Sequence, residues 1–273
     1  MGNIGGKASC KSEHTETSRF NSPLKEKALE PLPLGSIQPR GWLLNQLRIQ
    51  ADGLSGHLDE FWPDIKESAW FGGGCDNWER TPYWLDGLVP LAFLLDDPKL
   101  KAKAVNYIDK IIVRQDDAGW IAPSKDQARY DLWAIFLVLK PLIQYHEVTG
   151  DERVLKVVEK CLRWLDRHIE RYPLFNWAKF RWFEALIGVY WLYEQTGGKW
   201  LLDLAVKLQA QGFNWESFFE RCPTVNPTPK GRWSFMSHVV NNAMAIKAPA
   251  LWWRLTGDEK DRKMVYEIME KLD

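Results

Sequence analysis

The side chains best suited to chemistry in this sequence recur at one position relative to four apolar segments. Each segment contains a Pro or a Gly, and ten to twelve residues before that residue the chain offers polar or aromatic side chains. Those four places are occupied by Glu79-Arg80, Tyr130-Asp131, Trp177-Ala178 and Ser237-His238. Carboxyl and imidazole groups commonly serve as acids, bases and polar contacts in hydrolytic sites. We therefore expect one polar site that is assembled from four separate parts of the chain.

Further polar residues lie slightly deeper in the same apolar segments, where burial requires a partner or a cavity. They are Asp86, Arg181, Glu184, Asn241 and Asn242. From both groups and the adjoining loops we select six candidate substrate-binding residues: Trp78, Glu79, Asp131, Glu184, His238 and Asn241. A structural interpretation remains open for three of these residues. Asp131 is suited to capping a helix, Glu184 to pairing with Arg181, and His238 to a satisfied place in the core.

The catalytic residues themselves stay unassigned. Hydrolysis of a glycosidic bond usually requires two carboxyl groups that face each other across the bond. The sequence offers several carboxylates near the expected site but singles out no pair. The Gly-rich run at residues 71–79 lacks the Lys-Ser/Thr ending of a phosphate-binding loop, so we interpret it as a loop that touches substrate.

The elements that must position these residues are two alternating kinds of helix. The first kind is apolar nearly all round and is expected to be buried on every side. Its four members are predicted at residues 82–95, 131–148, 180–195 and 238–255. Each is followed by an amphipathic helix with one solvated face. These are predicted at residues 99–113, 152–170, 199–211 and 258–272, and one further helix at residues 42–52 precedes them all.

The same turns and interruptions recur in each helix pair and indicate an internal repeat of about 50 to 60 residues. A Pro or a Gly stands seven or eight residues before each turn: Pro90, Pro141, Gly188 and Pro249. An inner ring of apolar helices wrapped by amphipathic ones predicts an all-α fold of the (α/α)6-toroid type. The sequence holds about four of the six helix pairs and ends within a predicted helix. We therefore expect a truncated toroid over residues 32–273 after a flexible lead-in at residues 1–31, with a short solenoid as the alternative.

Charge and composition narrow the class of ligand. Lys plus Arg and Asp plus Glu each number 36, so no long-range field attracts nucleic acid, an anionic membrane or a polyanion. The 16 Trp residues exceed what packing requires. Some of these rings are expected to face a neutral sugar, because an indole offers a flat apolar face and a polar edge.

Targeting and metal-binding signals are missing from the pattern. We expect neither a signal peptide nor a membrane span, which favours the cytoplasm by default. The four Cys residues stand at positions 10, 75, 161 and 222, without the spacing of metal ligands, so we interpret them as ordinary thiols and assign no metal.

Two segments resemble those of a known enzyme family. The run from Asn77 to Leu88 is similar to the opening motif of glycoside hydrolase family 127, the β-L-arabinofuranosidase-like hydrolases, and residues 237–243 resemble a later helix start of that family. The resemblance implies an α/α toroid that removes L-arabinofuranose from plant glycans or glycoproteins by a retaining mechanism. It also implies that His238 contacts the sugar. In one departure, Tyr130-Asp131-Leu132-Trp133 stands where characterised members tend to carry a histidine.

The resemblance further implies a zinc-bound cysteine nucleophile and a glutamate acid/base, both from a segment after the fourth repeat. We expect that segment downstream of Asp273, so that this chain holds no cofactor by itself and zinc belongs to a longer family member. Two other functions remain open. One is a non-catalytic helical protein that binds carbohydrate or serves as a scaffold, and the other is a different toroid enzyme, such as an epimerase or a lyase. The oligomeric state is not predicted.

Overall fold

The computed structural model describes residues 24–222 and 233–273, and within those ranges the ordered elements are all helices. The N-terminal part holds α1 (Gly41–Asp52), α2 (Leu54–Phe61), α3 (Pro63–Lys66) and a 3-10 helix (Ala69–Phe71). The helices that follow are α4 (Arg80–Leu94), α5 (Pro98–Ile112), α6 (Trp133–Thr149), α7 (Glu152–Arg171), α8 (Asn176–Phe180), α9 (Phe183–Thr196), α10 (Trp200–Gln211), α11 (Trp215–Glu220), α12 (Val239–Ala245), α13 (Lys247–Thr256) and α14 (Glu259–Leu272).

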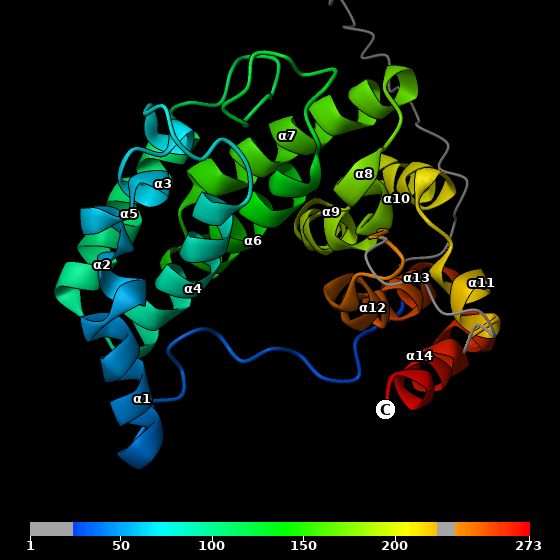
Figure 1. The fold of residues 1–273 in the computed structure, drawn as a ribbon, viewed down its shortest axis with the longest axis horizontal. Helices are drawn as coiled ribbons and strands as arrows, with labels where there is room; N and C mark the ends of the chain where they lie inside the picture. Colours follow the sequence, from blue (N-terminus) through cyan, green and yellow to red (C-terminus); the bar gives the residue numbers. More distant parts are fainter. Residues whose placement is uncertain (1–23, 223–232) are drawn as a thin grey trace, which may run out of the picture.

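Inner and outer helices alternate along an arc, as the sequence predicted (Figure 1). The inner helices α4, α6, α9 and α13 are neighbours in that order, and each packs against the outer helix that follows it in the chain. The central inner helix α6 is buried on nearly every side, whereas α7 buries one stripe from Val154 to Ile169 and leaves its other face to solvent. The predicted all-α fold of paired inner and outer helices is therefore confirmed.

The turns within the pairs have the predicted chemistry. Gly150, Gly197 and Gly257 take positive φ angles of 70°, 67° and 66°, a conformation that glycine adopts without a Cβ clash. In the first pair Asp96 takes that place, with φ 53°. After three of the four turns an Asp side chain caps the next helix by accepting backbone N–H groups: Asp97, Asp151 and Asp258.

The third inner helix is shorter than predicted, because residues 180–195 are divided between α8 and α9. Two backbone carbonyls at the end of α8 are taken by other partners. Lys179 O accepts from Phe213 N at 2.9 Å, and Phe180 O accepts from Trp215 Nε1 at 2.7 Å. Those carbonyls would otherwise receive the N–H groups of the next helical turn. The chain therefore bends at Arg181 before α9 begins.

The prediction of a single buried helix at residues 238–255 is wrong in two respects. It is divided into α12 and α13, and α12 is not buried all round, because Val239 and Val240 are 74% and 44% exposed. Pro249 lacks the N–H that would bond to Ala245, the last residue of α12, and so removes one hydrogen bond across the break. Pro90 in α4 and Pro141 in α6 also lack the backbone N–H, but these two helices continue without a break.

The segment at residues 24–33, here called the strap, crosses the open side of the arc from α13 toward α1 (Figure 1). Lys25 N donates to Arg254 O at 2.7 Å, and Arg254 Nε donates to Lys25 O at 3.2 Å. The strap includes the last part of the predicted lead-in, whereas residues 1–23 lie outside the described residues. Among the helices described, none is both long and apolar enough to cross a membrane.

Candidate functional site

The N-terminal ends of α4, α6 and α9 open on one side of the arc, and α8 and α12 lie beside them; we call this region the mouth. Arg181, at the bend between α8 and α9, is only 3% exposed and lies at its centre. Its guanidinium carbon is 4.5 Å from the ring centroids of both Trp133 and Trp177. A cation between two indole rings is held by cation–π attraction and by flat packing. The bend that ends α8 thus delivers a buried cation to the mouth.

Arg181 joins two of the predicted site residues. Its Nε donates to Asn241 Oδ1 at 2.8 Å, and its Nη1 lies 4.0 Å from Glu79 Oε2. Glu79 Oε2 also accepts from Trp133 Nε1 at 2.7 Å. Burial lowers the pKa of Arg181, whereas Tyr83 and Glu79 oppose that shift. One guanidinium therefore connects α4, α6 and α12 through polar contacts.

Glu184 has a different partner from the one that its spacing suggested. It lies in the first turn of α9, is only 1% exposed and forms an ion pair with Lys247 of α13. A buried carboxylate requires such a partner to keep its charge. The charge of Arg181 still acts on it from the bend before α9, but the direct contact runs to the neighbouring repeat.

Asp131 is a capping residue that serves two helices. Its carboxylate accepts from the backbone N–H of Trp133 at 3.1 Å, and from those of Trp177 and Ala178 at 2.9 and 3.0 Å. The first bond belongs to the start of α6, and the other two to the first turn of α8. Burial raises the pKa of Asp131 although these three donors favour the carboxylate. Asp131 therefore positions α8, which carries Trp177, on the start of α6.

His238 and Trp78 both contact the ring of Trp177, and the three rings form an aromatic wall. The Trp177 ring centroid is 6.1 Å from that of Trp78 and 5.2 Å from that of His238. His238 also caps α12, because its Nδ1 accepts from Asn241 N at 3.4 Å. Trp233 extends the wall at 5.8 Å from Trp177 and is 59% exposed, so one indole face is open to solvent.

The structure thus places all six predicted residues at the mouth, in direct contact with one another or through Arg181 and Trp177. Several side chains that hold them together were not among the six: Tyr83, Trp133, Trp177, Arg181, Trp233 and Lys247. Trp177 was reached by counting back from Gly188, and Arg181 was noted as a polar residue slightly deeper in the same apolar segment. The ion pair of Lys247 with Glu184 depends on the packing of α13 against α9. The spacing of residues along one helix does not indicate that packing.

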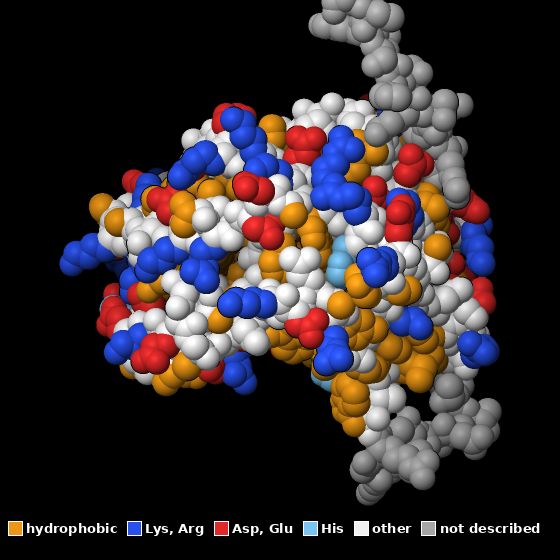
Figure 2. Space-filling view, turned by 90° about the horizontal axis from the view of Figure 1, so that it is seen from above, with side chains coloured by type: hydrophobic (Ala, Val, Ile, Leu, Met, Phe, Trp, Pro, Cys, Tyr) orange, Lys and Arg blue, Asp and Glu red, His pale blue; other side chains and the backbone are white. Residues whose placement is uncertain are grey.

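Two hollows adjoin the mouth, and Glu79 lines both of them. One has a volume of about 310 Å³ and is walled by Trp62, Tyr83 and Trp84, and the other has about 480 Å³ and contains Asp76 and Trp78. Asp86 lies deeper and is bound to Lys140 and Gln144 of α6, at 2.8 and 3.2 Å. Acidic and basic side chains are mixed on the face seen from above, without a patch of one sign (Figure 2). That mixture agrees with the balanced charge of the sequence and suits a neutral ligand.

The comparison with known protein families supports the interpretation of these motifs. Residues 32–273 match the family model described as Beta-L-arabinofuranosidase, GH127 catalytic domain. No curated protein matches the chain. The match covers every helix described above and both segments on which the resemblance rested, and an all-helical α/α toroid is the fold of that domain. The chain therefore belongs to glycoside hydrolase family 127, the β-L-arabinofuranosidase-like hydrolases.

Proposed function

We propose that the mouth binds a terminal L-arabinofuranosyl unit of a plant glycan or glycoprotein, for hydrolysis with retention of configuration. A glycoside hydrolase domain implies a carbohydrate substrate, and the family match suggests which sugar. The observation that carries the proposal is the cluster of Glu79, Arg181 and Asn241 beside the Trp177 wall. It combines donors, acceptors and flat apolar faces within a few ångströms.

These groups suit the chemistry of a furanose ring. Sugar hydroxyls both donate and accept hydrogen bonds, which a carboxylate, a guanidinium and an amide can satisfy together. The C–H faces of the ring pack on an indole face, for which Trp78, Trp177 and Trp233 are available. The neutral ligand needs no excess charge, because Arg181 lies close to Glu79, and Lys247 balances Glu184.

The three mouth carboxylates are not equivalent in this proposal. Asp131 is engaged by three backbone donors, and Glu184 is enclosed beside Lys247. The Glu79 side chain is 29% exposed and lines both hollows. Glu79 is therefore the carboxylate that we assign to substrate contact, with Asp131 and Glu184 as positioning residues.

The described residues do not fit a zinc-bound nucleophile. No group of three His, Cys, Asp or Glu within residues 24–222 and 233–273 is arranged to hold a metal ion. Cys161 is enclosed in α7, and burial raises the pKa of its thiol to about 12, which disfavours the thiolate that attacks or ligates. Cys75 and Cys222 lie elsewhere in the chain. We therefore derive no step through zinc from these residues.

The test measures sugar binding and hydrolysis by a Glu79→Gln variant of the 273-residue chain. The amide keeps the shape and the contact to Trp133 but loses the charge, so we expect binding of methyl β-L-arabinofuranoside to weaken about tenfold or more. Saturation-transfer NMR measures binding, and release of p-nitrophenol from p-nitrophenyl β-L-arabinofuranoside measures hydrolysis.

The matched control is Asp117→Asn, an exposed carboxylate in the loop between α5 and α6. It should leave binding unchanged. Equal binding by wild type and Glu79→Gln would refute the assignment of Glu79. Binding without release of arabinose by a longer chain that also carries the expected catalytic segment would instead support a carbohydrate-binding protein.

A further inference from the structure

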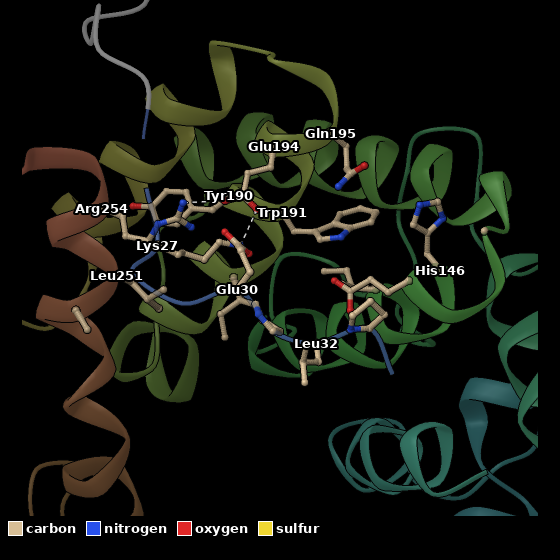
Figure 3. A pocket seen from close by; sticks show the side chains of 17 residues that line it. Lys27, Glu30, Leu32, His146, Tyr190, Trp191, Glu194, Gln195, Leu251 and Arg254 are labelled. Carbon is tan, nitrogen blue, oxygen red and sulfur yellow. Dashed lines mark hydrogen bonds and ion pairs between the residues drawn. The ribbon is translucent and has the colours of Figure 1, made fainter. Parts of the chain in front are cut away.

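A cavity of about 880 Å³ lies at the opposite end of the inner helices from the mouth (Figure 3). Its walls come from the C-terminal parts of α6, α9 and α13 and from the strap, which crosses over it. Along α6 the cavity-lining Glu147 stands 14 residues after Trp133, a separation of about 21 Å at the helical rise per residue. The mouth and this cavity are therefore separate places on one helix.

The charges around the cavity are largely paired with one another. Lys27 Nζ lies 2.8 Å from Glu30 and 3.3 Å from Glu194, and Arg254 Nη2 lies 2.8 Å from Glu194. Glu147 adds a further carboxylate, and burial raises its pKa. The C-terminal ends of three helices also carry partial negative charge. An anionic ligand is therefore disfavoured, whereas hydroxyl groups that donate hydrogen bonds are suited to this surface.

The lining combines apolar wall with polar edges, and its aromatic rings are largely covered, since Trp191 is 7% and Tyr190 2% exposed. Trp191 extends its ring along the cavity toward His146, and the two ring centroids are 5.3 Å apart (Figure 3). Ile187 and Leu251 add apolar wall, whereas Glu147 and the exposed Gln195 stand at the rim. An apolar wall with acceptors and donors around its edge matches the C–H faces and hydroxyl rims of sugar rings. The volume lies within the range of small-molecule sites.

We propose that this cavity is a second carbohydrate-binding site, which holds a neutral unit of a glycan chain away from the mouth. The choice of a sugar rests in part on the proposed function, whereas the choice of a neutral ligand rests on the paired charges alone. A glycan held here at the same time as one at the mouth would raise the local concentration of substrate.

The experiment titrates the 273-residue chain with L-arabinotriose by isothermal calorimetry. We expect two binding equivalents for the wild type. Leu251→Trp places a bulky ring in the cavity wall and should remove one equivalent, while Glu79→Gln should weaken only the other. Gln195→Ala, at an exposed rim position, should weaken cavity binding about threefold to tenfold through one lost hydrogen bond. The anionic digalacturonate should not compete at the cavity.

Leu43→Trp is the matched control, because it makes the same change at a leucine of α1 that is outside the cavity. It should leave both equivalents in place, and urea unfolding of each variant shows whether the fold is kept. A single equivalent that Glu79→Gln weakens, no binding to the wild type, or two equivalents unaffected by Leu251→Trp and Gln195→Ala would each overturn the second site. Loss through Leu251→Trp with no effect of Glu79→Gln would instead support the cavity and refute the mouth assignment.

Discussion

Tyr130 and Tyr190 are both buried, but their hydroxyl groups have opposite surroundings. The Tyr130 hydroxyl donates to the backbone oxygen of Asn77 at 2.7 Å and so holds the Gly-rich loop against the start of α6. The Tyr190 hydroxyl, in α9, has no hydrogen-bond partner among the described residues. A buried polar group without a partner costs desolvation free energy, whereas a paired one contributes a modest net gain.

The same chemical change should therefore have opposite effects at the two tyrosines. Tyr130→Phe is expected to lower the free energy of unfolding by about 1 kcal/mol, and Tyr190→Phe to leave it unchanged or raise it. Urea denaturation followed by Trp fluorescence measures both. A loss at Tyr190→Phe as large as that at Tyr130→Phe would contradict the structural assignment.

His168 should make the stability of the domain depend on pH. Its ring stacks between Trp164 and Tyr172, with centroids 4.2 and 5.0 Å away, and burial lowers its pKa below the ordinary value of 6.5. Because the unfolded chain takes up the proton first, this contribution to stability is complete above pH 6.5 and is lost as the pH falls toward the folded pKa. In His168→Gln the midpoint of unfolding should depend less on pH over that acidic range. His57→Gln, in α2, serves as the control. An unchanged pH profile in His168→Gln would contradict the role of burial.

For individual residues, the sequence predicted which of them gather at the mouth better than it predicted their partners. Asp131 and His238 were placed correctly because they follow the repeat register. One interpretation that the sequence left open paired Glu184 with Arg181, three residues before it, but the ion pair is made with Lys247 of the next repeat. Which side chain of one helix faces which of another depends on rotation and packing, and these are not expressed in spacing along a single helix.

Among the helical elements, the four turns provide an internal comparison of residues in one backbone conformation. Asp96 takes the positive φ that Gly150, Gly197 and Gly257 take in the later pairs. Asp tolerates this conformation better than most residues with a Cβ, but glycine adopts it without a steric clash. The ion pair of Asp96 with Lys101 is exposed, and exposed pairs contribute little.

We therefore expect Asp96→Ala to lower stability by about 1 kcal/mol, in line with the usual cost of a left-handed residue. Asp96→Gly should be neutral or slightly stabilising, with Asp96→Asn as the conservative control. Thermal unfolding of the three variants beside Gly150→Ala measures the series. If Asp96→Ala were as stable as Asp96→Gly, the turn would not require this conformation.

The predicted bounds of the helices were most accurate where one pattern dominated. The helix predicted at residues 152–170 is α7, Glu152–Arg171, because its apolar stripe has a regular helical period. The apolar helices gave a weaker signal of where they end. Pro90, Pro141 and Pro249 look alike in sequence, yet only Pro249 coincides with a break. A proline removes one bond in each case, and packing around the remaining turns decides whether the helix continues.

Across the whole molecule, a small ion-pair network fixes the strap to α9 and α13. Glu194 of α9 is its centre, because it contacts both Lys27 of the strap and Arg254 of α13. Glu194→Gln keeps the shape and removes the charge. Because a partly exposed pair is worth up to about 1 kcal/mol, the strap should open about fivefold more often.

Hydrogen exchange at residues 24–33 measures that opening, and exchange in α6 should stay unchanged. Glu159→Gln is the control, since Glu159 pairs with Arg163 on the same helix, at 3.7 Å. Equal exchange of the strap in wild type and Glu194→Gln would show that the backbone bonds between Lys25 and Arg254 hold it alone.

The order of helix pairs along the arc could be predicted from the sequence, since each pair follows the last and packs on it. The course of the strap could not. Its residues have no helical period, and its partners lie at the far end of the chain, so no local pattern reports the contact. The cavity beneath it was missed for the same reason.

The distance along the chain that the strap contact closes also sets when it forms. Lys25 and Arg254 are 229 residues apart, whereas the contacts within each helix pair are local. Local contacts form early in folding, and a loop of this length is closed only after the repeats have brought its ends together. Substitutions in the strap should therefore accelerate unfolding and leave the refolding rate nearly unchanged. In kinetic terms, the strap contact is the last to form during folding and the first to break during unfolding.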